Sequence, residues 1–147
     1  MRARLGVVKG DEAWSVTLIW QQNGDQFQMQ LIAPLGQGTT TLKGTAAFVQ
    51  AYYPDGQSAL YQNPEQVFTE ALGVAVPIDS LRYWVLGRVD QRSPAKVVKN
   101  SQGRLEEIIQ DGWEVSYLRY SEQGLPSKIV AENGSIEVKL IIKDWFE

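Results

Sequence analysis

Few side chains in this sequence could perform catalysis, and their spacing does not favour it. The 147 residues include no histidine and no cysteine, so the commonest general base, the commonest metal ligand and any thiol nucleophile are missing. Glu106 and Glu107 are adjacent on an expected strand, so they point to opposite faces and cannot share a proton. A serine nucleophile would need a base, and nothing points to a Ser–Lys pair. The sequence therefore predicts neither an enzyme nor a cofactor or metal site.

Two short motifs could be mistaken for binding or modification sites. Gly36-Gln37-Gly38 lacks the third glycine and the strand-to-helix context of a dinucleotide-binding loop. Asn133-Gly134-Ser135 matches a glycosylation sequon, but Asn-Gly between two expected strands favours a type I′ turn. Both motifs are therefore interpreted as turns.

The composition is that of an ordinary globular protein, with 44% apolar and 21% charged residues. A net charge of −3 gives no field that would attract nucleic acid, so no nucleic-acid partner is expected. The length fits one domain over residues 1–147, expected to be a monomer. No apolar run approaches the roughly 20 residues that span a bilayer, and the start lacks a signal peptide's apolar stretch. We expect a soluble chain from which a targeting segment could have been removed.

Strand periodicity covers most of the chain. Phe27, Met29 and Leu31 alternate with glutamines, and residues 12–21 alternate in the same way. Turn signals such as Asn23-Gly24 separate these segments. The expected strands are 2–8, 12–21, 25–33, 39–42, 46–53, 58–61, 96–98, 105–110, 113–120, 128–132 and 135–145.

Helical spacing interrupts the strands once, in the middle of the chain. Asn63 is a suitable N-cap before Pro64, and Gly73 ends the first helix; a second begins at Asp79 or Ser80 and ends at Gly87. Many antiparallel strands with two short helices predict a mainly β (α+β) fold. We expect a single, strongly curved antiparallel sheet that forms an open half-barrel, with short lid helices over its hydrophobic concave face.

Two short helices offer too little surface to fill the apolar face of so large a sheet. Either the core closes on itself, or a cavity remains for an apolar guest. The pattern does not separate residues that fill a core from residues that line a cavity. The cavity and lid candidates are Trp14, Trp20, Phe27, Met29, Leu31, Phe68, Leu72, Tyr83, Trp84, Trp113, Val115 and Tyr117.

The loop Pro34–Gly38 contains one large side chain, Leu35, between a proline and a glycine. This leucine has no obvious core to enter. It either folds back against the sheet or remains exposed at the tip of the loop.

Five segments together resemble the LolB family, the outer-membrane lipoprotein receptors of Gram-negative bacteria. The segments are WQQNGDQFQMQLIAPLGQG, LRYWVLG, GRLEEIIQDGWEVSY, LPSKIV and IEVKLIIKDW, in this order along nearly the whole chain. The resemblance implies an open, curved antiparallel sheet around a hydrophobic cavity, with helices as its lid. It also implies localisation at the periplasmic face of the outer membrane.

The function implied by the resemblance is transfer of lipoproteins. Proteins of this family accept the acyl chains of a lipoprotein from the periplasmic carrier LolA and insert them into the inner leaflet of the outer membrane. An exposed leucine on a protruding loop is needed for insertion, and the matching loop here is Pro34, Leu35 and Gly36. Family members carry a signal peptide and an acylated cysteine. This sequence has neither, so we expect a truncated, soluble form.

Three other functions remain open at this point. A soluble LolA-type carrier would lack an anchor, although carriers are expected to lack an exposed leucine loop. An enzyme acting on a lipid or a cell-wall substrate is the second alternative. The third is a purely structural β-domain with a filled core, which would take up no fatty-acid probe.

Overall fold

A computed structural model describes residues 1–45 and 47–145 of the chain. Its strands are β1 (Arg2–Lys9), β2 (Glu12–Asn23), β3 (Gln26–Ile32), β4 (Thr39–Gly44), β5 (Val49–Tyr52), β6 (Ser58–Tyr61), β7 (Ala95–Lys99), β8 (Leu105–Gln110), β9 (Trp113–Tyr120), β10 (Pro126–Glu132) and β11 (Ile136–Asp144). Its helices are a 3₁₀ turn (Pro34–Gly36), α1 (Pro64–Leu72) and α2 (Ile78–Trp84). The expected start of β5 at Ala46 lies outside the described residues.

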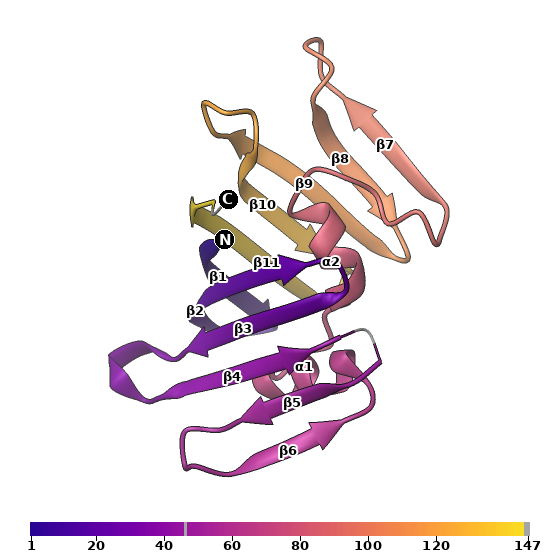
Figure 1. Ribbon diagram of the computed structural model, residues 1–147. Coiled ribbons are helices and arrows are strands. Elements are labelled where there is room, and N and C mark those ends of the chain that lie inside the picture. Colours follow the sequence, from indigo (N-terminus) through magenta and orange to yellow (C-terminus); the bar gives the residue numbers. More distant parts are fainter. Residues whose placement is uncertain (46, 146–147) are drawn as a thin grey trace. The chain divides into compact units, whose positions relative to one another are not determined.

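Within the described residues, the strands form one antiparallel sheet of 11 strands (Figure 1). Their order is β6-β5-β4-β3-β2-β1-β11-β10-β9-β8-β7. Strands β6 and β7 stand at the two ends of this order, so the sheet is not closed. The prediction of a mainly β protein with a single open antiparallel sheet and two short helices is confirmed.

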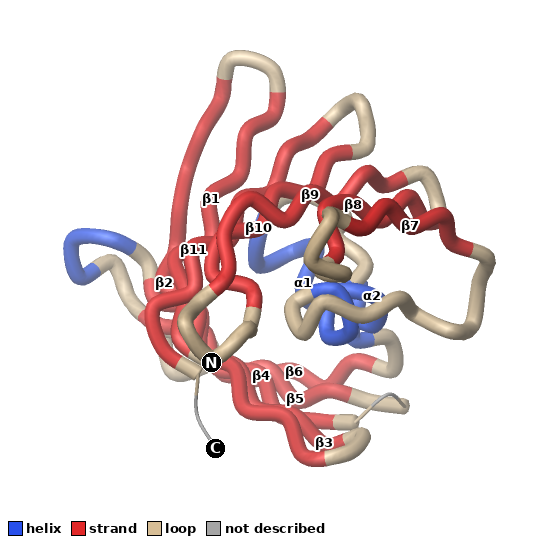
Figure 2. Tube along the Cα trace, turned by 90° about the horizontal axis from the view of Figure 1, so that it is seen from above, coloured by secondary structure: helices blue, strands red, loops and turns tan. Residues whose placement is uncertain are grey.

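The chain divides into two compact units. The first unit contains Met1–Arg4, Ser15–Ile78 and the residues from Lys143 onward; the second contains Leu5–Trp14 and Asp79–Ile142. Each unit carries one of the two α-helices, which Figure 2 shows in blue, and its own part of the core.

The core of the first unit follows one row of facing residues across its strands. Trp20 of β2 pairs with Met29 of β3, Met29 with Leu42 of β4, and Leu42 with Ala51 of β5. All four are buried. Such cross-strand neighbours on one face are the contacts that stabilise a sheet. Helix α1 lies against β5 and β6 of the same unit.

Helix α1 has the ends that its sequence predicts. The side chain of Asn63 accepts a 3.0 Å hydrogen bond from the backbone N–H of Glu65, and Pro64 occupies the first turn. At the other end Gly73 adopts a left-handed conformation (φ 81°), and its N–H donates to the carbonyl oxygen of Thr69. The predicted helix and both of its boundaries are therefore confirmed.

The second unit repeats the pattern of facing residues. Ile108 of β8 pairs with Val115 of β9, Val115 with Ala131 of β10, and Ala131 with Val138 of β11. All four are buried. Alternation of apolar and polar residues in these strands therefore identifies the inner face correctly.

Helix α2 ends at Trp84, three residues before the expected stop at Gly87. The chain then closes with a Schellman motif. Gly87 has a left-handed backbone conformation (φ 74°), and its N–H donates to the carbonyl oxygen of Trp84. The N–H of Arg88 donates to the carbonyl oxygen of Tyr83. Gly87 therefore caps the C-terminal end of α2 from a position beyond the last helical residue.

The turn at Asn133 differs in type from the expected one. The N–H of Asn133 bonds to the carbonyl oxygen of Ile136, so Gly134 and Ser135 are the central residues. Only Gly134 has a positive φ, whereas a type I′ turn requires it at both central positions. The predicted hairpin is correct and the predicted turn type is wrong, because Asn133 precedes the turn centre. Its side chain instead accepts hydrogen bonds from the N–H groups of Ser135 and Ile136.

Candidate functional site

The loop between β3 and β4 extends past the ends of both strands (Figure 1). Two backbone hydrogen bonds close it: the N–H of Ala33 donates to the carbonyl oxygen of Gly38 at 3.0 Å, and that of Gln37 donates to Pro34 at 3.3 Å. The short 3₁₀ turn Pro34–Gly36 forms the tip and has no buried residue. The loop is thus an ordered hairpin end.

Leu35 lies at this tip with 96% of its surface exposed. Its backbone is left-handed (φ 60°, ψ 29°), a conformation that costs an L-residue without special stabilisation about 1–2 kcal/mol. A large apolar side chain gains nothing for folding by being exposed and strained at once. Strained, exposed positions of this kind are typical of contact sites.

The base of the loop is held by a close approach. Gly38 has φ 119°, and a Cβ atom placed on it would lie 2.6 Å from Cβ of Pro54 in the β5–β6 connection. Only glycine allows the backbone at position 38 to come this near to the ring of Pro54. The base of the loop is therefore fixed, while the side chain of Leu35 at its tip is almost fully exposed.

A cleft of about 430 Å³ lies beside this loop in the first unit. Its lining comes from β1, β2, β3, the loop and the last residues of β11: Arg2, Ala3, Arg4, Ser15, Val16, Thr17, Ile32, Pro34 and Lys143. Pro34 belongs to both the cleft and the loop tip. The cleft thus combines basic, hydroxyl and apolar side chains next to Leu35.

Most of the predicted cavity and lid residues are buried, and the remaining three, Trp14, Phe27 and Tyr83, are half-buried. The buried ones are Trp20, Met29, Leu31, Phe68, Leu72, Trp84, Trp113, Val115 and Tyr117. Met29 and Phe68 have no accessible surface at all, which excludes contact with any internal void wide enough for water. In this conformation an acyl chain could reach these side chains only if elements of the unit separated.

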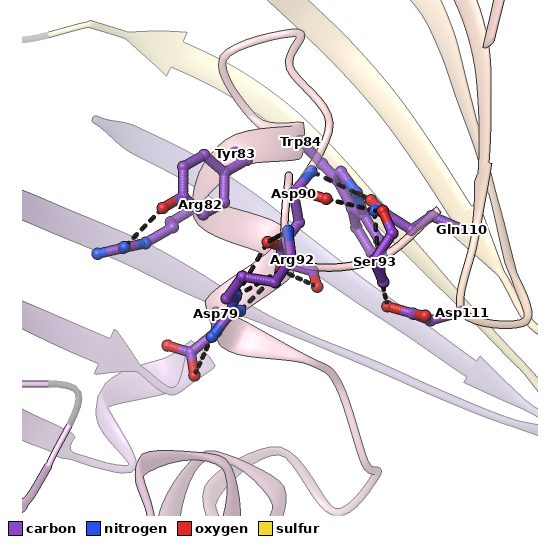
Figure 3. Close-up of polar contacts among 10 residues, drawn as sticks. Asp79, Arg82, Tyr83, Trp84, Asp90, Arg92, Ser93, Gln110 and Asp111 are labelled. Carbon is purple, nitrogen blue, oxygen red and sulfur yellow. Dashed lines mark hydrogen bonds and ion pairs between the residues drawn. The ribbon is translucent and has the colours of Figure 1, made fainter. Parts of the chain in front are cut away.

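Helix α2 is tied to β8 and β9 through Trp84. Figure 3 shows its contact with Gln110 of β8. The indole Nε1 of Trp84 donates a 2.9 Å hydrogen bond to Oε1 of Gln110, and the hydroxyl of Tyr117 donates a 2.5 Å bond to the carbonyl oxygen of Trp84. The ring of Trp113 lies 6.4 Å from that of Trp84 at 51°. Burial raises the pKa of Tyr117, so its hydroxyl keeps the donated proton.

Gln110 is the centre of a second set of buried hydrogen bonds. Its Nε2 donates to the carbonyl oxygens of Asp90 at 2.6 Å and Ser93 at 3.0 Å, while its Oε1 also accepts from the N–H of Asp90. One side chain on β8 therefore forms hydrogen bonds both with helix α2 and with the loop that follows it. Buried amides with all partners in place rigidify the elements they join.

Asp90 is a buried carboxylate in the same loop, with 3% of its surface exposed. Arg92 donates to both of its oxygens, at 2.7 Å in the shortest contact, and Ser80 of α2 donates at 2.9 Å. Hydrogen bonds from the Arg92 side chain hold the pKa of Asp90 well below its usual range, against the effect of burial. The contacts fix the loop to α2, and nothing in them resembles an acid–base pair.

A larger cleft of about 840 Å³ lies in the second unit, beside the α2–β7 loop. Tyr83 is the only predicted site residue among the described residues that line it. Its basic residues include Arg104, whose guanidinium carbon lies 5.2 Å from the centre of the Tyr120 ring.

Sequence reasoning named Trp84, Trp113 and Tyr117 as cavity and lid candidates. It missed Gln110, Asp90 and Arg92, which complete the α2 network. One signal was present: alternation along β8 puts Gln110 on the same face as buried Ile108, and a glutamine there requires buried partners. Asp90 and Arg92 gave no such signal, because they lie in a polar segment between the expected helix end at Gly87 and the expected strand 96–98. The basic residues of the smaller cleft were missed because they come from opposite ends of the chain.

Within residues 1–45 and 47–145 no group of acidic, histidine or cysteine side chains is arranged to hold a metal ion. No helix in the same ranges has the length and apolar character needed to cross a membrane.

Comparison with known proteins shows the family. Residues 1–145 match the family described as "Outer membrane lipoprotein LolB". The chain is 35% identical to the outer-membrane lipoprotein LolB of Nitrosococcus oceani, over 99% of this chain and 74% of that protein. It is 33% identical to the protein of that name from Stutzerimonas stutzeri (97% and 70%) and 30% identical to that from Thiobacillus denitrificans (99% and 78%). The chain belongs to the LolB family, as its sequence segments predict.

This membership gives the broad role. The LolB family consists of lipoprotein localisation factors of the outer membrane and is not known as a family of enzymes. The homologues are outer-membrane lipoproteins, and the family implies lipoprotein substrates and a LolA partner.

Proposed function

We propose that this protein accepts the acyl chains of lipoproteins from a LolA-like periplasmic carrier and inserts the lipoproteins into the inner leaflet of the outer membrane. It acts as a single lipoprotein-binding domain and as a monomer at the periplasmic face of that membrane. The observation that carries the proposal is Leu35, 96% exposed on a loop whose base is fixed.

Leu35 is suited to brief contact with a bilayer. Burying one leucine side chain in an apolar phase contributes about 1.5–3 kcal/mol. This is too little for stable anchoring and enough to hold the loop in the membrane during a handover. The exposed leucine also argues against the alternative of a soluble carrier, which has to release from membranes.

The acyl chains are proposed to bind against the apolar residues that the sequence identifies as cavity and lid candidates. Each buried methylene contributes about 0.8 kcal/mol, so a chain of ordinary length binds tightly without directional contacts. Because Phe68 of α1 and Trp84 of α2 are fully buried, entry requires the helix of a unit to move off its strands. Helices α1 and α2 are therefore the proposed lids.

A transfer experiment with liposomes tests this function. Acylated lipoprotein is loaded on a LolA-type carrier and offered to the wild type and to Leu35→Glu. We expect the variant to accept lipoprotein as the wild type does and to deliver little of it to liposomes. Leu60→Glu is the matched control, because Leu60 is also exposed (66%) but lies on β6.

Two results would contradict the proposal. Loss of acceptance together with delivery would give Leu35 a structural role only. Full delivery by Leu35→Glu would show that insertion does not need the exposed leucine, and it would favour a soluble carrier.

A further inference from the structure

We propose that the cleft beside the Leu35 loop binds the phosphate head group of an anionic phospholipid. This inference rests on the proposed function, because it assumes that the loop contacts a membrane. It adds a preference for anionic lipids. It also adds a polar contact with the membrane, at the cleft, to the apolar contact that Leu35 makes. The cleft and the loop both belong to the first unit.

The charge of the cleft favours an anion. Its charged lining residues among those described are Arg2, Arg4 and Lys143, and no acidic side chain lines it. Arg2 is paired with Asp144 at 2.7 Å, whereas Arg4 and Lys143 form no ion pair with any described residue. Two cations are thus available to a ligand, and both are exposed.

The other lining residues fit the remaining parts of a phospholipid head. Ser15 and Thr17 of β2 have hydroxyl groups that can donate to phosphate oxygens, and the side chain of neither is bonded elsewhere in the described structure. Ile32 and Pro34 provide apolar surface for the glycerol end of the acyl chains. A volume of about 430 Å³ lies within the range of small-molecule sites.

The position of the cleft favours a lipid over a free anion or an acidic protein. Pro34 lines the cleft and directly precedes Leu35, so a leucine inserted in a bilayer brings lipid head groups to Arg4 and Lys143. Surfaces that bind anionic membranes usually combine apolar side chains that insert into the bilayer with basic side chains beside them.

Vesicle binding tests the inference. The protein is sedimented with phosphatidylcholine vesicles and with vesicles that also contain phosphatidylglycerol. We expect tighter binding to the anionic vesicles, a loss of that difference at high salt, and about a fivefold weaker binding for each of Arg4→Gln and Lys143→Gln. Binding of these variants to phosphatidylcholine should not change. Arg4→Lys should retain most of the preference, which separates lost charge from lost packing.

Matched controls locate the effect. Lys139→Gln removes an exposed lysine from the same strand as Lys143, outside the cleft. Arg104→Gln removes an arginine from the larger cleft of the second unit. Both should bind anionic vesicles as the wild type does. A fivefold loss in Arg104→Gln with none in Arg4→Gln would overturn the proposal in favour of the larger cleft.

The remaining outcomes separate this inference from the proposed function. Leu35→Glu should weaken binding to both kinds of vesicle. If this variant binds both as the wild type does, the result contradicts the proposed function and not the inference about the cleft. Equal binding to neutral and anionic vesicles would overturn the inference alone. Competition by millimolar inorganic phosphate as strong as that by a short-chain phosphatidylglycerol would show a site for the free anion, and this too would overturn it.

Discussion

The indole nitrogen of Trp84 donates a 2.9 Å hydrogen bond to Oε1 of Gln110, and this contact ties α2 to β8 inside the second unit. Gln110 is 1% exposed and also bonds the backbone of Asp90. Moving a helix away from its strands requires free energy when buried hydrogen bonds hold it there. The contact therefore bears on both stability and the proposed opening of the lid.

Gln110→Leu is expected to destabilise the protein by about 1–3 kcal/mol. The substitution leaves the indole N–H of Trp84 and the backbone N–H of Asp90 buried without the oxygen that accepts from them. Urea unfolding measures the change, and Gln123→Leu, on an exposed turn, serves as the control. Equal stability of Gln110→Leu and the wild type would show that the network contributes nothing to folding.

Tyr117→Phe is expected to ease the movement of α2. It removes the donor to the carbonyl oxygen of Trp84 while keeping the buried ring. One hydrogen bond is worth about 1 kcal/mol, so uptake of a fluorescent fatty acid should become about fivefold faster if α2 is a lid. The control is Tyr120→Phe, which removes a bond to Leu105 of β8 and none to α2. Identical uptake by Tyr117→Phe and the wild type would argue against α2 as the lid.

Asp90→Asn should show a stability difference that depends on pH. The pKa of Asp90 is lowered in the folded state from an ordinary value of 3.8, chiefly by hydrogen bonds from Arg92. Its carboxylate therefore stabilises the fold above about pH 4, and the effect is lost as the pH falls further. We expect a difference of about 1–2 kcal/mol at pH 7, limited because the Arg92 side chain is 62% exposed. Unfolding at pH 7, 4 and 2.5 checks this, and a constant difference would contradict it.

Gly38→Ala should disrupt the base of the Leu35 loop. The added Cβ would lie 2.6 Å from Cβ of Pro54, in addition to the cost of the positive φ. We expect a loss of more than about 1 kcal/mol. Gly36→Ala is the matched comparison, because it also has a positive φ but no atom within 4 Å of the added Cβ. Thermal unfolding distinguishes them, and equal losses would show that contact with Pro54 is unimportant.

Much of the fold could be predicted from local sequence signals. Alternation places Met29 and Val115 on the inner face, and Asn63 and Gly73 mark the ends of α1, because each signal acts over a few residues. The turn at Asn133 shows the limit: the dipeptide predicts a hairpin, and the strand register decides which residues occupy its centre.

The candidate site could be predicted only in part. Leu35 stands out locally, as an apolar residue between turn formers. The cleft beside it joins Arg4 to Lys143, and the α2 network joins Trp84 to Gln110. Contacts between residues so far apart in sequence depend on the strand order, which no local pattern specifies.

A fluorescent probe at position 35 tests the central claim most directly. The chain has no cysteine, so Leu35→Cys can be labelled at one place with an environment-sensitive dye, and Leu60→Cys provides the control. If Leu35 enters the bilayer, adding vesicles should shift the emission of the dye at position 35 to the blue and leave that at position 60 unchanged. Unchanged emission at position 35, under conditions where the protein delivers lipoprotein, would contradict the account.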